Sequence, residues 1–219
     1  MTGRAVVRLG LAGLAVALVG VDPGPVAGHN VGVYVPRDNE VSANFKQLKF
    51  AIQAGKLDVA ARLFEGGAVR AEMRAQASRL PAGLEEATRA ALETGDARGA
   101  ERGLMIFFAA LARDLAREAD RRLADPGEPV EARVAAGRKF LEAIWRYYNL
   151  VDFAVTQYDS KAGVAIRLAL DEAEGYAKTA PGRPATAPDP TKMREPLRRI
   201  AQALSGLIAT SSASTRRDS

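Results

Sequence analysis

Apolar residues along most of this chain recur at spacings of three and four positions, which places their side chains on one face of an α-helix. Phe45, Leu48 and Ile52 form the first such stripe, and Gly55 stands where a helix would end. The periodicity predicts helices over residues 40–54, 57–80, 84–94, 97–123, 129–157, 161–177 and 194–210. The second of these falters at the Gly66 and Gly67 pair before it continues. We therefore expect an all-α fold: a helical-hairpin bundle of about six to seven helices, with an extended arm at its N-terminus.

Proline-rich and small-residue segments divide the chain into regions. Four prolines fall within residues 179–190, so this stretch is expected to be a linker and not regular helix. The predicted regions are a signal peptide (1–28), an extended arm (29–39), a helical bundle (40–178), a Pro-rich linker (179–193), a C-terminal helix (194–210) and a disordered tail (211–219). The C-terminal helix should pack on the bundle or on a partner through its apolar residues Leu197, Ile200, Leu204, Leu207 and Ile208.

Two ten-residue stretches share the order helix end, glycine, charged turn and alanine. They are AIQAGKLDVA, residues 51–60, and ALETGDARGA, residues 91–100, and their glycines, Gly55 and Gly95, lie forty positions apart. The string GKLDVA resembles the inter-helix turn of tetratricopeptide repeats, but this spacing does not fit that family's period of about 34 residues. We therefore expect a reused helical hairpin and not membership of the family.

The N-terminal segment has the layout of a secretory signal peptide. Arg4 and Arg8 precede LGLAGLAVALVGV, residues 9–21, which would rise only about 20 Å as a helix and fall short of a bilayer core of roughly 30 Å. Cleavage after Gly28, or after Ala27, fits the small residues found there. We expect a periplasmic or secreted protein that does not span the membrane after cleavage.

Composition bears on which chemistry the chain can perform. With no cysteine and one histidine, it has no disulfide, thiolate metal site or cysteine nucleophile. It shows no Gly-rich phosphate loop and no metalloprotease or serine-hydrolase motif, so we expect no enzyme and no cofactor. The net charge is +5, but Arg is interleaved with Asp and Glu, which favours solvated helix faces over a nucleic-acid site. We expect the partner to be another envelope protein or an acidic envelope component.

Metal or haem binding depends on few available ligands. His29 would become the N-terminus after cleavage at Gly28, where its imidazole and the α-amino group could chelate Cu(II). A histidine-brace copper enzyme needs a second histidine, which this chain lacks, so the alternative is a frayed terminus. Haem ligation is open to Met73, Met105 or Met193, although single methionines at helical spacing are typical of a core.

The densest group of unusual side chains is WRYYNLVDF, residues 145–153. Tyr148 and Asp152 lie four positions apart and share a helix face. Asp152 also lies seven positions after Trp145, at the edge of the stripe that we expect to be buried. A charge at such an edge requires a partner.

The following helix supplies candidate partners for this group. An antiparallel hairpin that turns near Asp159 places Arg167 level with Asp152, and Glu172 level with Arg146. Two cross-helix ion pairs would then fix the register of the hairpin. In the alternative, the wall of a ligand pocket is formed by Trp145, Tyr148, Asp152, Arg167 and Glu172. The inward positions expected on the second helix are Ala165, Leu168, Ala169, Ala173 and Tyr176.

Two functional hypotheses follow from these patterns. The first is an exported non-catalytic helical protein that serves as an interaction or scaffold protein of the cell envelope, because amphipathic helices are sufficient for that role. The alternative is a small-ligand, metal or haem-binding helical bundle in the periplasm, which would need a cavity between the two long helices.

Export makes a direct prediction about the N-terminus. The mature protein should begin at His29, or at Gly28, because cleavage follows the small residues after the apolar run. N-terminal sequencing of the protein from fractionated cells measures this. Met1 retained on protein in a cytoplasmic fraction would contradict the export hypothesis.

Overall fold

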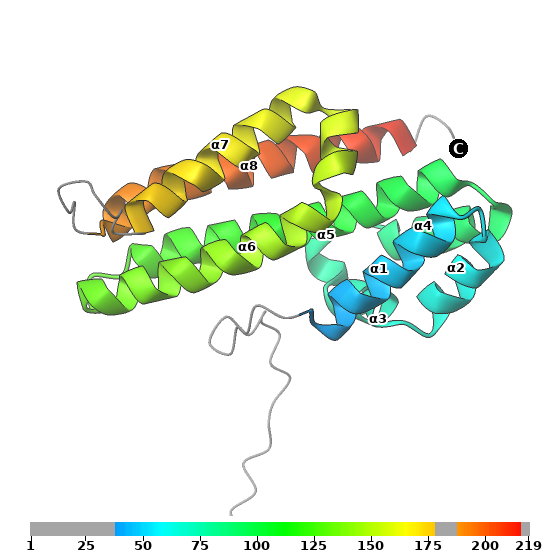
Figure 1. Ribbon diagram of the computed structural model, residues 1–219, viewed down its shortest axis with the longest axis horizontal. Helices are drawn as coiled ribbons and strands as arrows, with labels where there is room; N and C mark the ends of the chain where they lie inside the picture. The colour runs from blue at the N-terminus through cyan, green and yellow to red at the C-terminus, as the bar shows by residue number, and fades with distance from the viewer. Residues whose placement is uncertain (1–37, 178–187, 216–219) are drawn as a thin grey trace, which may run out of the picture.

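A computed structural model describes residues 38–177 and 188–215, and all regular structure in these residues is helical (Figure 1). This confirms the all-α prediction. A short 3-10 helix, Ala77–Arg79, lies between α3 and α4. The α-helices are α1 (Glu40–Gln53), α2 (Leu57–Glu65), α3 (Ala68–Ala75), α4 (Leu84–Thr94), α5 (Ala97–Leu123), α6 (Val130–Tyr158), α7 (Ser160–Ala177) and α8 (Pro190–Thr215).

The four longest helices form an antiparallel bundle. Going round it, α5 packs on α6, α6 on α7, α7 on α8, and α8 returns to pack on α5 (Figure 1). The side of the bundle formed by α6 and α7 is therefore opposite the side formed by α5 and α8. The shorter helices α1–α4 form a second group, which covers the N-terminal half of α5.

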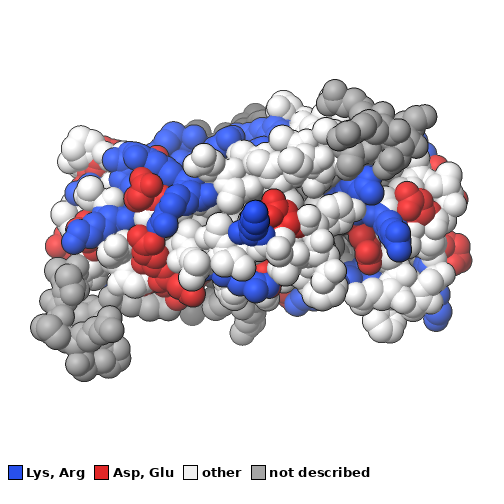
Figure 2. Space-filling view, turned by 90° about the horizontal axis from the view of Figure 1, so that it is seen from above, with Lys and Arg blue, Asp and Glu red and all other residues white. Residues whose placement is uncertain are grey.

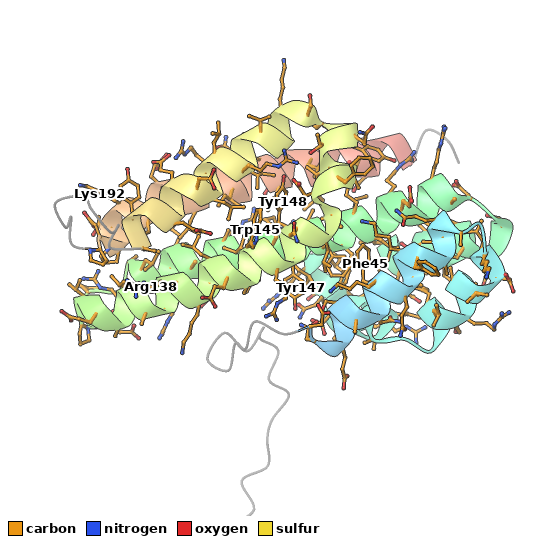
Figure 3. All side chains as sticks on the ribbon, viewed as in Figure 1. Phe45, Arg138, Trp145, Tyr147, Tyr148 and Lys192 are labelled. Carbon is orange, nitrogen blue, oxygen red and sulfur yellow. The ribbon has the colours of Figure 1, made fainter. Side chains whose placement is uncertain are left out.

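Helix α5 is the centre of the molecule. Residues 104–112 are each at most 2% exposed. Helices α6 and α8 pack against this stretch within the bundle, and the α1–α4 group covers the side that remains. Aromatic rings join the layers: the centroid of Phe108 lies 4.6 Å from that of Phe45 in α1 and 5.8 Å from that of Tyr147 in α6. Tyr147 accordingly lies on the side of α6 that faces α1, and Phe45 belongs to α1 (Figure 3).

The forty-residue spacing corresponds to a repeated helical hairpin. Gly55 and Gly95 both adopt positive φ, at 69° and 82°, which glycine tolerates because it has no Cβ. In each turn the residue after the glycine caps the preceding helix with a backbone hydrogen bond. The amide of Lys56 donates to the carbonyl of Ala51 at 2.9 Å, and the amide of Asp96 donates to the carbonyl of Ala91 at 2.8 Å. The same turn therefore links α1 to α2 and α4 to α5.

The segment predicted over residues 57–80, with a weak point at Gly66 and Gly67, is divided there into two helices, α2 and α3. Asn44 of α1 stabilises the break, because its side chain donates to the carbonyl of Leu63 at 3.1 Å and accepts from the amide of Val69 at 3.0 Å. A Cβ on Gly67 would lie only 2.3 Å from the Asn44 Oδ1 atom. This division raises the number of α-helices in the described residues to eight, above the six to seven expected.

Helix α8 is longer at both ends than the sequence predicted. It begins at Pro190, because the Asp189 carboxylate accepts hydrogen bonds from the amides of Thr191 and Lys192, at 2.9 and 3.1 Å. Pro196 lies inside the helix, and residues 211–215, expected in a disordered tail, are helical. The expected packing on the bundle is confirmed, because all five apolar residues are buried: Leu197, Ile200, Leu204, Leu207 and Ile208.

Some predicted regions fall outside the described residues. These are the signal peptide, the arm up to residue 37, most of the Pro-rich linker and residues 216–219. Within residues 38–177 and 188–215, none of the helices combines the length and apolar character needed to cross a membrane.

Helices α4 and α5 approach closely at Gly103, which predicts a stability difference between two glycines. A Cβ at Gly103 would lie 2.1 Å from Oγ1 and 3.1 Å from Cβ of the buried Thr88, whereas a Cβ at Gly206 in α8 meets nothing within 4 Å. Gly103→Ala should therefore lower the free energy of unfolding by about 1–3 kcal/mol. Gly206→Ala should raise it by about 0.5–1 kcal/mol. Denaturant unfolding measures both, and equal effects would contradict the close approach.

Candidate functional site

Asp152 and Arg167 form the centre of the candidate site between α6 and α7. Arg167 donates two hydrogen bonds to the Asp152 carboxylate, from Nε to Oδ1 at 2.9 Å and from Nη2 to Oδ2 at 2.6 Å. This confirms the first of the two predicted cross-helix ion pairs. Trp145 and Tyr148 lie on the same side of α6, the side that faces α7 (Figure 3), with ring centroids 6.3 Å apart.

Burial and the ion pair act in opposite directions on the pKa values here. Burial alone would raise the pKa of Asp152, but hydrogen bonds from Arg167 and Tyr148 outweigh it and hold that pKa below its usual value. The pKa of Tyr148 is raised, first by burial and then by its contact with the Asp152 carboxylate. At neutral pH, Asp152 is therefore charged and Tyr148 keeps its proton.

Two further residues complete this group, and the sequence analysis did not identify them. The Thr156 hydroxyl accepts from Arg167 Nη2 at 3.1 Å and donates to the Asp152 carbonyl at 2.9 Å. A Cβ on Gly163 would lie 2.9 Å from that hydroxyl, so glycine allows α7 to approach α6 here. Thr156 lies one helical turn after Asp152, and Gly163 lies one turn before Arg167. These positions are the only signal in the sequence that could have identified the two residues. The arrangement links two helices through satisfied polar groups and fixes their register.

The second predicted ion pair, between Arg146 and Glu172, is wrong. Glu172 pairs with Arg199 of α8. Arg146 faces the start of α1, where the pKa of Asp38 is lowered chiefly by a hydrogen bond from Lys46 and in part by the charge of Arg146.

Helical geometry explains this correction. Arg146 lies six positions before Asp152 and is rotated about 120° from it around α6. Glu172 lies five positions after Arg167 and is rotated about 140° from it around α7, toward α8. The antiparallel register placed the residues at the correct height along the hairpin but did not specify which face each one occupies.

The inward stripe predicted for α7 is also partly wrong. Leu168 is 62% exposed and Ala165 is exposed, whereas Ala169 and Ala173 are buried as expected and Tyr176 is half-buried. The observed stripe is Gly163, Ile166, Ala169, Leu170, Ala173 and Ala177. An alanine-rich helix has apolar residues on several faces, so periodicity alone did not distinguish the buried stripe from its neighbour.

Large apolar side chains lie on the outer surface of α6 and α7, around the Asp152–Arg167 pair. We call this surface the α6–α7 face and define it by four residues that are 43–70% exposed: Trp145, Phe153, Val164 and Leu168. Phe153 follows Asp152, and Leu168 follows Arg167, so each projects outward beside the ion pair. Trp145 was expected within the buried stripe; its position at the edge of that stripe leaves it 43% exposed.

A cleft of about 360 Å³ lies between α4, the N-terminal half of α5 and the end of α8. The ligand-binding hypothesis had placed a cavity between the two long helices instead. Asp96, Arg102, Thr88 and Ser212 provide polar groups among its lining residues. The Ser212 hydroxyl is buried without a hydrogen-bond partner in the described residues, and Arg102 donates to the Tyr158 hydroxyl at 2.7 Å.

Metal binding has no further support from the described residues. Across residues 38–177 and 188–215, no three or more histidine, aspartate or glutamate side chains gather in a way that could hold a metal ion. His29, the candidate copper ligand, lies outside this part of the chain.

The chain matches no known protein family, no curated protein and no solved structure. The functional argument therefore depends on the geometry described above.

The Asp152–Arg167 pair predicts energetic coupling between α6 and α7. Asp152→Ala and Arg167→Ala should each lower the free energy of unfolding at pH 7. The double variant should lose less than the sum by about 0.5–1 kcal/mol, because Arg167 is 44% exposed and water screens the pair. Because the folded pKa of Asp152 is lowered, this coupling is present above pH about 4 and is lost as pH falls through the folded value.

Arg146 and Glu172 provide the matched control for this cycle. Their effects should add within about 0.5 kcal/mol, because they do not form an ion pair with each other. Additive losses for Asp152 and Arg167 in denaturant unfolding would contradict the pairing.

Proposed function

We propose that this chain is an exported, non-catalytic interaction protein of the cell envelope, and that the α6–α7 face binds a partner protein. The exposure of Phe153 and Leu168, at 70% and 62%, carries the proposal. Single exposed apolar residues are common on protein surfaces, but several large ones grouped on adjacent helices are typical of interaction sites. The export part of the proposal is supported by the signal-peptide layout of residues 1–28.

The polar groups beneath the α6–α7 face favour binding over catalysis. Arg167 engages the Asp152 carboxylate, and the single hydroxyl proton of Tyr148 is shared between that carboxylate and the Gly163 carbonyl, 3.3 Å from the hydroxyl. Groups held in this way keep the two helices in register and so preorganise the apolar side chains around them. Large aromatic and aliphatic side chains held on rigid helices are suited to act as anchors of a protein interface.

The cleft beside α4 favours a second candidate function, the binding of a small ligand. Its volume of about 360 Å³ is within the range of small-molecule sites, which is about 300–1,000 Å³. The buried Ser212 hydroxyl could hydrogen-bond a ligand there. A stoichiometric organic ligand, detected by native mass spectrometry of protein purified from the envelope, would favour this function over the first.

Site-specific crosslinking tests the proposed interface. A photoreactive phenylalanine analogue in place of Phe153 should form an adduct with a partner in intact cells, because this side chain projects from the α6–α7 face. The matched control is Phe50 in α1, which is 73% exposed but lies outside this face. Adduct formation at 153 and not at 50, measured by immunoblot and mass spectrometry, is the expected result.

A second substitution tests whether the adduct at position 153 depends on the other residues of the α6–α7 face. Leu168→Ser should reduce crosslinking at position 153 without lowering the melting temperature, because Leu168 makes little contact with the core. Equal crosslinking at positions 50 and 153, or no adduct at either, would contradict this interface.

A further inference from the structure

Helices α5 and α8 together carry more arginines than carboxylates on the opposite side of the bundle. We call this surface the α5–α8 face. Its carboxylates are Asp114, Glu118 and Asp120 from α5, and Glu195 from α8. Its arginines are Arg113, Arg117 and Arg121 from α5, and Arg194 and Arg198 from α8.

Asp120 is shared by two arginines. Arg194 Nε lies 2.6 Å from its Oδ1 atom, and Arg198 Nε lies 3.0 Å from its Oδ2 atom. Burial alone would raise the pKa of Asp120, but these two hydrogen bonds outweigh it and lower that pKa. The carboxylate of Asp120 therefore pairs with two guanidinium groups, and these three side chains together carry a net charge of about +1.

Asp114 repeats this arrangement one and a half turns earlier in α5. Arg113 Nε lies 2.8 Å from Asp114 Oδ1, and Arg117 Nη1 lies 3.9 Å from the same atom. Arg117 also donates to the Ser205 hydroxyl of α8 at 3.1 Å, which orients its guanidinium across the two helices. Glu118 pairs with Arg121, and the charge of Glu195 acts on Arg198, so the face as a whole has an excess of one positive charge.

The excess charge is accessible to a partner. The side chains of Arg117, Arg121 and Arg198 are 51%, 68% and 52% exposed. Seen from the side of α7 and α8, Lys and Arg lie together with Asp and Glu over the end of the molecule where α8 begins (Figure 2). No large exposed apolar side chain of the described residues belongs to this face, which separates it chemically from the α6–α7 face.

We propose that the α5–α8 face docks on the phosphate head groups of an anionic lipid surface and leaves the α6–α7 face turned away from it. The orientation rests on the proposed function, because it presents the protein-binding face to the aqueous compartment. Guanidinium groups form bidentate hydrogen bonds with phosphate oxygens. Two long antiparallel helices also make a broad surface, which suits a membrane plane.

Charge complementarity favours lipid over single-stranded nucleic acid. Binding of single strands depends on aromatic side chains for base stacking, and the exposed aromatic residues of the described chain, Phe50, Trp145, Phe153 and Tyr158, are not part of this face.

Vesicle sedimentation with charge-matched variants tests the docking surface. The full exported chain is mixed, at low salt, with vesicles of three parts phosphatidylcholine to one part phosphatidylglycerol. Removing two exposed arginines with Arg117→Gln and Arg121→Gln should weaken partitioning by about 25-fold, at about fivefold for each charge. The matched control, Arg62→Gln and Arg89→Gln, removes two arginines from α2 and α4 and should change partitioning less than about threefold.

A variant that is expected to bind more strongly controls for loss of binding through misfolding. Glu118→Gln removes a negative charge from the α5–α8 face and should strengthen partitioning by about fivefold. A melting curve for each variant checks that the fold is retained.

The orientation has its own readout in Trp145, the single tryptophan of the chain. Quenching of its fluorescence by acrylamide should not change when the protein binds vesicles, because Trp145 lies on the side turned away from the lipid. Shielding of Trp145 on binding would overturn the orientation.

Three results would overturn the docking surface itself: equal losses in the test and control variants, no binding to the anionic vesicles, or binding to soluble polyphosphate without binding to vesicles. Each of these is distinct from the crosslinking result at Phe153, which tests the proposed function separately.

Discussion

Burial of α5 on every side is the constraint on which the rest of the structure depends. Residues 104–112 offer no polar side chain and are at most 2% exposed, so this stretch is stable only when neighbouring helices surround it completely. Helices α6 and α8 cover it within the bundle, and the α1–α4 group covers the remaining side. The two groups of helices therefore share one core, which Phe45 and Phe108 join through their rings.

A second constraint follows from the first. Because much of the N-terminal half of α5 packs against α1–α4, most of its outward surface lies in its C-terminal half, and that surface carries Arg113, Arg117 and Arg121. Helix α7 packs on α6 and α8 and lies across the bundle from α5, so its outer residues Val164 and Leu168 are exposed. The chemical difference between the two faces thus originates in which helices must cover α5.

Local sequence signals predicted much of this fold. Gly55, Gly95 and the Asp159 turn marked helix ends because glycine φ and side-chain capping act within a few residues. The Asp152–Arg167 pair was also predictable, since a short turn fixes the height of residues in an antiparallel hairpin. The partner of Glu172 was not predictable from the sequence. It is Arg199 of α8, which lies beyond the linker, and this pairing depends on how α7 and α8 pack together. The exposure of Leu168 likewise depends on which of two apolar stripes α8 selects.

The ratio of charges within each ion-pair group connects stability to function. Asp152 and Arg167 pair one to one, so they fix the register of α6 and α7 and leave the surrounding surface free for apolar contact. Asp120 serves two arginines, so the same interaction that holds α8 on α5 leaves a positive charge at the surface. Each carboxylate would cost stability if left buried without its arginines. The packing of the bundle therefore requires these pairs, and their stoichiometry determines which face remains apolar and which remains basic.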